Sequence, residues 1–141
     1  MSERDRLLVP GETCWRVERA NRLALIIDAA DYFRFAKAAM LKAKHRIMLI
    51  GWDFDTRIKF EPGTATLKGP NKLGRFLQWL PKQRPNLRIH LLKWNLGMFQ
   101  ALGRGMTPLF ILDLVTTSRL QLKLDAAHPA GAAHHQNIIV I

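Results

Sequence analysis

The sequence contains a single cysteine, Cys14. One thiol cannot form a disulfide within the chain, and a zinc site built from several cysteines is excluded. This composition fits a reducing compartment, and we expect Cys14 to be chemically inert. The predicted location is therefore the cytoplasm.

Long hydrophobic runs are also missing. The first 15 residues, MSERDRLLVPGETCW, lack the apolar core of a signal peptide. No later run reaches the roughly 18 uninterrupted apolar residues that a membrane-spanning helix needs. The longest apolar region, residues 23–40, is interrupted by charges that would be costly in hydrocarbon: Asp28, Asp31, Arg34 and Lys37. We predict a soluble protein, for which peripheral contact with a membrane stays open.

Acidic residues are few. The 11 Asp and Glu stand against 22 Lys and Arg, which gives a formal net charge of +11. Such an excess favours contact with phosphate groups in lipid head groups, nucleic acid or a phosphoester substrate. The basic residues are scattered along the chain, which is more typical of a solvated surface than of a nucleic-acid groove. Nucleic acid is therefore not the expected partner.

What is present predicts one α/β domain. Residues 1–22 are polar and without clear periodicity, so we expect an extension there and a domain over residues 23–141. Apolar runs predict strands at residues 23–27, 46–52, 87–94, 120–124 and 137–141. Helical patterns separate the first four of them. The order predicts a layered sandwich with a mainly parallel (mixed) central sheet flanked by helices.

The helical patterns differ in clarity. Asp31 is the expected N-cap of the first helix, and four residues are predicted to share its buried face: Tyr32, Phe35, Ala39 and Ala43. The second helix carries a clear apolar stripe that Pro81 should end: Leu73, Phe76, Leu77 and Leu80. Residues 98–115 contain two glycines and a proline and favour two short helices.

Three of the five histidines fall in one loop of small residues before the last predicted strand: His128, His134 and His135. Side chains in such a loop can converge on a ligand. A metal site is disfavoured, because adjacent histidines at a strand entrance point to opposite faces and Asp125 is the one carboxylate nearby. His45 and His90 have ordinary structural explanations, at a helix end and within a strand.

Polar and aromatic residues also follow two of the predicted strands. Asp53 and Asp55 come after the strand at 46–52, where α/β folds place binding sites. A solvated strand end with Asp55 paired to Arg57 explains them equally simply, and we favour it. Trp94 ends the next apolar strand, where it could line a pocket mouth or fill the sheet edge, and Trp52 presents the same two alternatives.

The segment DAAHPAGAAHHQNIIVI, residues 125–141, resembles the first active-site segment of the phospholipase D superfamily, whose motif is His-x-Lys-x4-Asp. Residues 23–58, LALIIDAADYFRFAKAAMLKAKHRIMLIGWDFDTRI, are similar to the N-terminal half of its bacterial branch. The resemblance extends from about Val17 to Ile141. It differs at two points, because Asn137 occupies the lysine position and the aspartate position would follow Ile141.

The resemblance implies a half of a phospholipase D-like phosphodiesterase or transphosphatidylase. His135 would be the nucleophile that forms a phosphohistidine, with Asn137 in the place of the charged lysine. The implied substrate-binding residues are His128, His134, Gln136 and Trp94. No metal or cofactor is implied, and the partners are a phospholipid or other phosphodiester and a second catalytic half or homodimer partner.

Two consequences and two alternatives follow. The chain is expected to be an incomplete first half, since a second histidine must protonate the leaving alcohol, and to be inactive alone. A nuclease of the same superfamily would use the same histidine chemistry. The alternative from another class is a non-catalytic phosphate- or lipid-surface-binding protein, which Asn137 and the charge of +11 favour.

Overall fold

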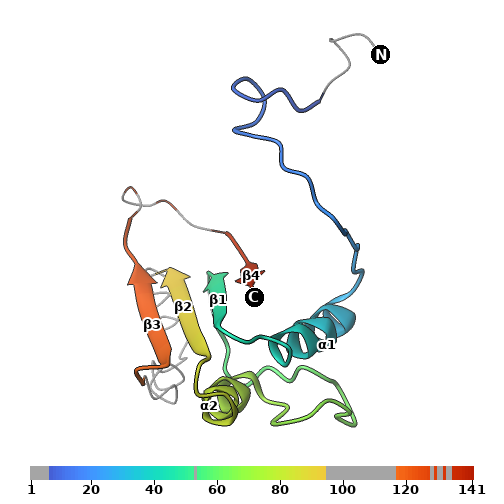
Figure 1. Ribbon diagram of the computed structural model, residues 1–141, viewed down its shortest axis with the longest axis vertical. Helices are drawn as coiled ribbons and strands as arrows, with labels where there is room; N and C mark the ends of the chain where they lie inside the picture. Colours follow the sequence, from blue (N-terminus) through green and yellow to red (C-terminus); the bar gives the residue numbers. More distant parts are fainter. Residues whose placement is uncertain (1–6, 53, 95–116, 128, 130–131, 133–134) are drawn as a thin grey trace.

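The computed structural model describes residues 7–52, 54–94, 117–127, 129, 132 and 135–141. Its elements in chain order are α1 (Ala29–Met40), β1 (Arg46–Gly51), α2 (Leu73–Gln83), β2 (Arg88–Trp94), β3 (Leu120–Asp125) and β4 (Ile138–Val140). The strands form one sheet in the order β3-β2-β1-β4 (Figure 1). β1, β2 and β3 are parallel, whereas β4 runs antiparallel to β1. The predicted α/β class and mixed sheet are confirmed. The segment 98–115, with its two expected helices, lies outside the described residues.

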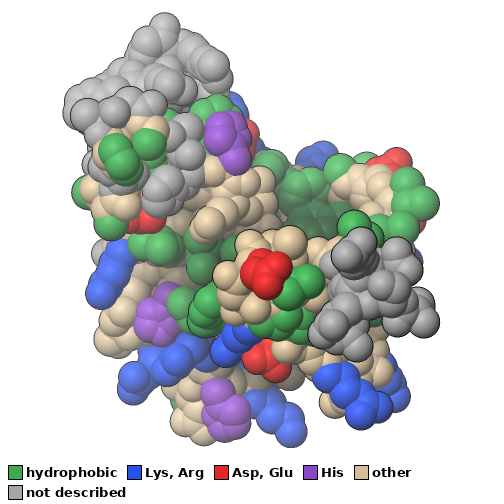
Figure 2. Space-filling view, turned by 90° about the horizontal axis from the view of Figure 1, so that it is seen from above, with side chains coloured by type: hydrophobic (Ala, Val, Ile, Leu, Met, Phe, Trp, Pro, Cys, Tyr) green, Lys and Arg blue, Asp and Glu red, His purple; other side chains and the backbone are tan. Residues whose placement is uncertain are grey.

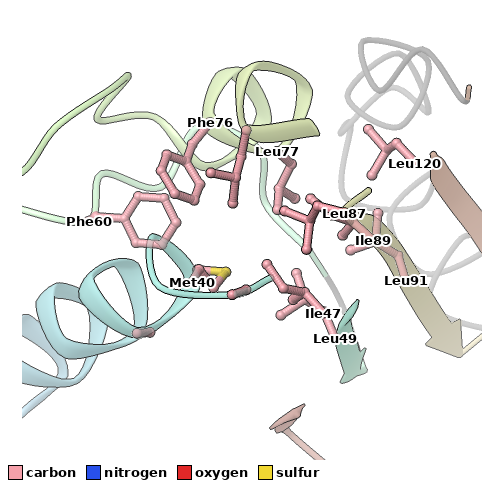
Figure 3. Close-up of a cluster of buried hydrophobic side chains, with 13 residues drawn as sticks. Met40, Ile47, Leu49, Phe60, Phe76, Leu77, Leu87, Ile89, Leu91 and Leu120 are labelled. Atoms are coloured by element: carbon pink, nitrogen blue, oxygen red, sulfur yellow. The ribbon is translucent and has the colours of Figure 1, made fainter. Parts of the chain in front are cut away.

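The core lies between the two helices and one face of the sheet. Alternate residues of the parallel strands point to this face, and the register places Ile47 beside Ile89 and Leu49 beside Leu91. These side chains meet the apolar residues of both helices in one cluster (Figure 3). On the opposite face Met48 and Ile50 are half-buried. Both described helices therefore contribute to the same side of the sheet.

Helix α2 follows its predicted apolar stripe. Phe76, Leu77 and Leu80 are almost completely buried, and Leu73 packs against the same cluster. The helix continues two residues past Pro81 to Gln83, which corrects the expected end. A proline in the last turn removes only one helical hydrogen bond, so the turn can still close.

Helix α1 corrects two expectations. Its N-cap is Asp28 rather than Asp31, because the Asp28 carboxylate accepts a hydrogen bond of 2.7 Å from the Ala30 amide. The buried face of the helix consists of Ala36, Lys37 and Met40. The predicted face was wrong within the helix, since its members there are exposed: Tyr32, Phe35 and Ala39.

Lys37 can lie on the buried face because Glu61 meets it there. The Lys37 Nζ lies 3.2 Å from Glu61 Oε2 and 3.2 Å from the Leu67 carbonyl oxygen. The second carboxylate oxygen of Glu61 accepts hydrogen bonds from the amide and the hydroxyl of Thr66. A buried charge is tolerated only when it is paired and hydrogen-bonded in this way. Hydrophobic periodicity does not reveal a partner 24 residues away.

Two predicted strands differ in the structure. Residues 23–27 form no strand, and Leu23, Leu25 and Ile27 are 93%, 88% and 79% exposed. This segment leads away from the sheet into the N-terminal extension (Figure 1). The last predicted strand, at 137–141, is present as β4 (Ile138–Val140), which lies at the edge of the described sheet with Ile138 and Val140 about half exposed. Among the described residues, no helix is long and apolar enough to cross a membrane.

Candidate functional site

The sequence-predicted site lies at the carboxyl edge of the sheet. Strands β1, β2 and β3 are parallel and end at Gly51, Trp94 and Asp125, so their carboxyl ends share one edge. Because β4 is antiparallel to β1, the residues just before Ile138 arrive at the same edge. This edge is where open α/β sheets usually bind ligands.

Three aromatic rings line up at this edge. The Trp52 ring is 6.1 Å from the Trp94 ring and 5.1 Å from the His135 ring, measured between centroids. Trp94 is buried, Trp52 is half-buried and His135 is exposed. The imidazole of His135 is thus in contact with the Trp52 ring, and the two ring planes are inclined by 33°. This contact limits the orientation of the imidazole. Trp94 supports Trp52 from within the sheet.

Asn137 has different surroundings. It lines a cavity of about 490 Å³ between α1, β1 and β4, whose other walls are mainly apolar. A Cβ atom added at Gly51 would lie 3.3 Å from Asn137 Oδ1 and 3.1 Å from the Phe54 ring. The absence of a side chain at Gly51 therefore allows the side chain of Asn137 to approach the backbone of β1.

His135 and Asn137 do not meet in this cavity. Residues two apart share a face only within a strand, and β4 begins at Ile138, after both of them. His135 precedes β4, which lies at one end of the strand order among the described strands. His135 contacts Trp52, whereas Asn137 faces Gly51 and Phe54.

Asp55 lies on the wall of the same cavity and is paired as predicted. Its two carboxylate oxygens accept hydrogen bonds of 2.9 and 2.8 Å from the Arg57 guanidinium, and its Oδ1 also accepts one from the Arg57 amide. The side-chain hydrogen bond from Arg57 lowers the pKa of Asp55, and partial burial opposes this effect. The charge of Asp55 is therefore balanced by Arg57.

Lys93, which ends the same predicted strand as Trp94, also reaches this edge in the structure. It pairs with Gly51 in the register of β1 and β2 and is buried. Strand alternation places it on the helix side of the sheet together with Ile89 and Leu91. Asn137 also approaches Gly51 on this face of the sheet, from the β4 side, whereas Lys93 lies on the β2 side. The signal was present in the sequence, as a lysine in phase with the apolar residues of a strand.

The remaining predicted residues contribute less. Gln136 is exposed next to His135. His128, His134 and Asp53 lie outside the described residues. Within the described part of the chain, no three His, Cys, Asp or Glu residues are grouped so that they could hold a metal ion.

Known proteins give no independent assignment for this site. No protein-family model matches the chain, and no curated protein matches it.

Proposed function

We propose that this chain is a half of a phospholipase D-like phosphodiesterase or transphosphatidylase in which His135 forms a phosphohistidine. The observation that carries the proposal is the position of His135, exposed at the carboxyl edge of the parallel strands and in ring contact with Trp52. An exposed imidazole at this edge can reach a phosphorus atom, and the indole restricts its rotation. Orientation of the nucleophile is a large part of such catalysis.

The proposed step is a displacement at phosphorus. A nitrogen of the neutral His135 ring attacks the phosphodiester and the phosphorus–oxygen bond to one alcohol breaks. That oxygen leaves with the electron pair and takes a proton from the histidine of the second half, so an alcohol departs. The remaining alcohol stays on phosphorus, so the product is a phosphohistidine ester. Water or a second alcohol then releases it and restores His135. This sequence gives hydrolysis in the first case and transphosphatidylation in the second.

Negative charge on the phosphoryl oxygens must be stabilised in this step. Asn137 can donate a hydrogen bond but carries no charge, which weakens stabilisation of the transition state.

The cavity beside Asn137 supports a lipid substrate over a nucleic acid. Its walls are mainly apolar and include Phe33, Met40 and Phe60. A hydrocarbon group attached to the phosphate gains stability in such a cavity, whereas a second charged phosphate does not. The view onto the carboxyl edge shows Lys and Arg in several separate groups, not in one continuous groove (Figure 2). A phospholipid is therefore our preferred substrate class, ahead of the nuclease alternative.

A second candidate is a protein that binds phosphate or a lipid surface without catalysis. The neutral, exposed Asn137 favours it, since an amide can bind an anion but stabilises a developing charge poorly. The two functions differ in one observable. The enzyme half forms a covalent bond to phosphorus at His135, and the binding protein does not.

The leaving group offers a direct test. A p-nitrophenyl phosphodiester carries a leaving group that departs without protonation, so His135 should react with it even where no second histidine assists. We expect about one equivalent of nitrophenolate per reactive chain, an acid-labile phosphoryl group on His135 by mass spectrometry, and no steady turnover. A diester with two alkyl alcohols should give no adduct under the same conditions.

His135→Ala should remove the adduct, and His45→Ala is the matched control because His45 is also exposed but lies far along the chain from the motif. An adduct that persists in His135→Ala would contradict the assignment of the nucleophile. Reversible phosphate binding with no adduct at all would favour the non-catalytic candidate.

A further inference from the structure

The N-terminal segment Leu23–Ile27 carries apolar side chains that the chain itself leaves in water. Leu23, Leu25 and Ile27 are spaced two residues apart in a segment whose backbone is drawn out (Figure 1), so that in a strand they would lie on one side. The sequence pattern is that of a strand, with apolar and β-branched residues in succession. In the structure this segment belongs to no sheet and projects from the N-terminal end of α1 (Figure 1).

Strand β4, with three residues, offers an apolar edge with which such a segment could pair. It is the last strand of the sheet on its side, so its outer edge presents backbone N–H and C=O groups that no described strand pairs. Ile138, Val140 and Ile141 are each about half exposed there. The apolar cavity lies under the same edge, lined by Ile138 and Ile139 of β4 and by Tyr32 and Phe33 of α1.

We propose that residues 23–27 of one copy of the chain add as a strand to the outer edge of β4 in a second copy. Addition of this strand would satisfy backbone groups on both sides and place alternate apolar side chains over the cavity. In a two-fold dimer each chain donates one segment and receives one, so the apolar area covered is doubled. The proposal does not rest on the chemistry of His135.

A second copy fits better than the same chain folding back. The Asp28 carboxylate caps α1 through the Ala30 amide, and the Asp28 carbonyl accepts a hydrogen bond from the Tyr32 amide. These bonds fix the direction in which the segment leaves the helix. Asp28 has a φ of 89°, a conformation that favours glycine, so this exit is specified at some cost in strain. Folding back onto its own β4 would require the segment to leave α1 in a different direction, with a new backbone conformation at Asp28. A neighbouring copy can bind the segment in the conformation that it has.

An anionic membrane is the competing occupant, because Arg16, Arg19 and Arg22 precede the segment. An extended backbone, however, cannot enter hydrocarbon without leaving its N–H and C=O groups unsatisfied. A sheet edge satisfies the same groups. The extended form of the segment therefore favours a strand partner.

Self-association measures the proposal directly. Sedimentation velocity over a range of concentrations should show the full chain in a monomer–dimer equilibrium. Leu25→Glu should raise the dissociation constant at least tenfold, and Val140→Lys should do the same from the receiving side. Leu7→Glu is the matched control, since Leu7 is 89% exposed but lies outside the segment, and it should leave the equilibrium unchanged. Far-UV circular dichroism should be the same in all variants.

Crosslinking identifies which copy provides the segment. In a Cys14→Ser background, chains with Leu25→Cys are mixed with chains with Val140→Cys and treated with a short bis-maleimide. We expect a covalent dimer of the two variants. A strictly monomeric chain overturns the proposal, as does crosslinking that occurs only when both cysteines are in one chain. An unchanged dimer in Leu25→Glu, with loss of binding to vesicles of phosphatidylcholine and phosphatidylserine, also overturns it in favour of the membrane.

Discussion

The Nζ of Lys37 lies 3.2 Å from Oε2 of Glu61, and neither side chain is more than 4% exposed. This ion pair joins α1 to the loop that precedes α2. The loop is held in turn through Thr66 and Leu67, whose amides donate hydrogen bonds to the same carboxylate. The pair therefore fixes the position of α1, which forms one wall of the cavity beside the candidate site.

Removal of Lys37 should destabilise the fold more than removal of any exposed lysine. Lys37→Met keeps the size of the side chain but leaves the Glu61 charge without its cation, a strongly destabilising change at a buried site. We expect the melting temperature to fall by roughly 10 °C or more. Lys44→Met is the control, because Lys44 is exposed after α1. Equal melting temperatures for the two variants would contradict a stabilising role for the pair.

Glu61 should also make stability depend on acidity. Hydrogen bonds from the Thr66 hydroxyl and amide are the main cause that lowers the pKa of Glu61 to about 2, from an ordinary value of 4.5. A carboxyl group with a lowered pKa in the folded state stabilises the fold above its unfolded value, and this contribution is lost as pH falls. The loss should occur between about pH 4.5 and about pH 2.

Thermal melts across this range would check the effect. Wild type should lose stability steeply below pH 4.5, and Glu61→Gln should be less stable at neutral pH but show a flatter acid profile. Glu18→Gln is the control, because Glu18 forms an exposed pair with Arg16. Parallel acid profiles for wild type and Glu61→Gln would show that another carboxyl group dominates.

Two glycines should respond differently to a methyl group. A Cβ at Gly74 would lie 2.7 Å from the Cβ of Thr56, whereas a Cβ at Gly51 would meet nothing nearer than the Phe54 ring at 3.1 Å. Gly74→Ala should therefore destabilise by about 1–3 kcal/mol, as is usual for overpacking, despite the helix preference of alanine. Gly51→Ala should cost less and displace Asn137. Denaturant unfolding would rank the two, and a reversed order would contradict this packing.

Local patterns in the sequence were sufficient to predict most of the sheet. The runs that became β1, β2 and β3 were placed to within one or two residues, and the stripe of α2 was correct, because period and burial agree there. The face of α1 was wrong because its burial depends on the pairing of Lys37 with Glu61. Residues 23–27 have the pattern of a strand, but a strand also requires a neighbouring edge with which to pair.

The site shows the same division. Trp52 and Trp94 come at the ends of neighbouring parallel strands, so parallel topology places them at one edge. His135 reaches the same edge because β4 runs antiparallel to β1, which the sequence pattern did not predict. The separation of His135 from Asn137 could not be predicted, since it depends on where β4 begins to pair with β1. The burial of Lys93 could have been predicted from the sequence, because Lys93 is in phase with the buried residues Ile89 and Leu91 of the same strand.

The last prediction concerns the charge that Asn137 lacks. Asn137→Lys should strengthen the binding of orthovanadate, a phosphate analogue, because a charged donor would replace a neutral one. A hydrogen bond to a charged group contributes about 1.5–3 kcal/mol, and water at this exposed position should reduce the gain to about tenfold in affinity. Asp55 should not capture the new lysine, since its carboxylate already holds Arg57 at 2.8 and 2.9 Å.

Gln136→Lys separates a local effect from a general one. It adds the same charge one residue away, also at an exposed position, so a gain from net charge alone would appear in both variants. We expect the gain in vanadate affinity only in Asn137→Lys. The measurement is a vanadate titration monitored by proton NMR of the histidine rings. Resonance changes should include His135, and turnover of an alkyl phosphodiester should stay absent, because a lysine cannot replace the acid that protonates the leaving alcohol.

Equal gains in the two variants would mean that the anion responds to overall charge and that position 137 has no special place in the site. Steady turnover by the 141-residue chain with no second histidine engaged would contradict the two-histidine mechanism itself.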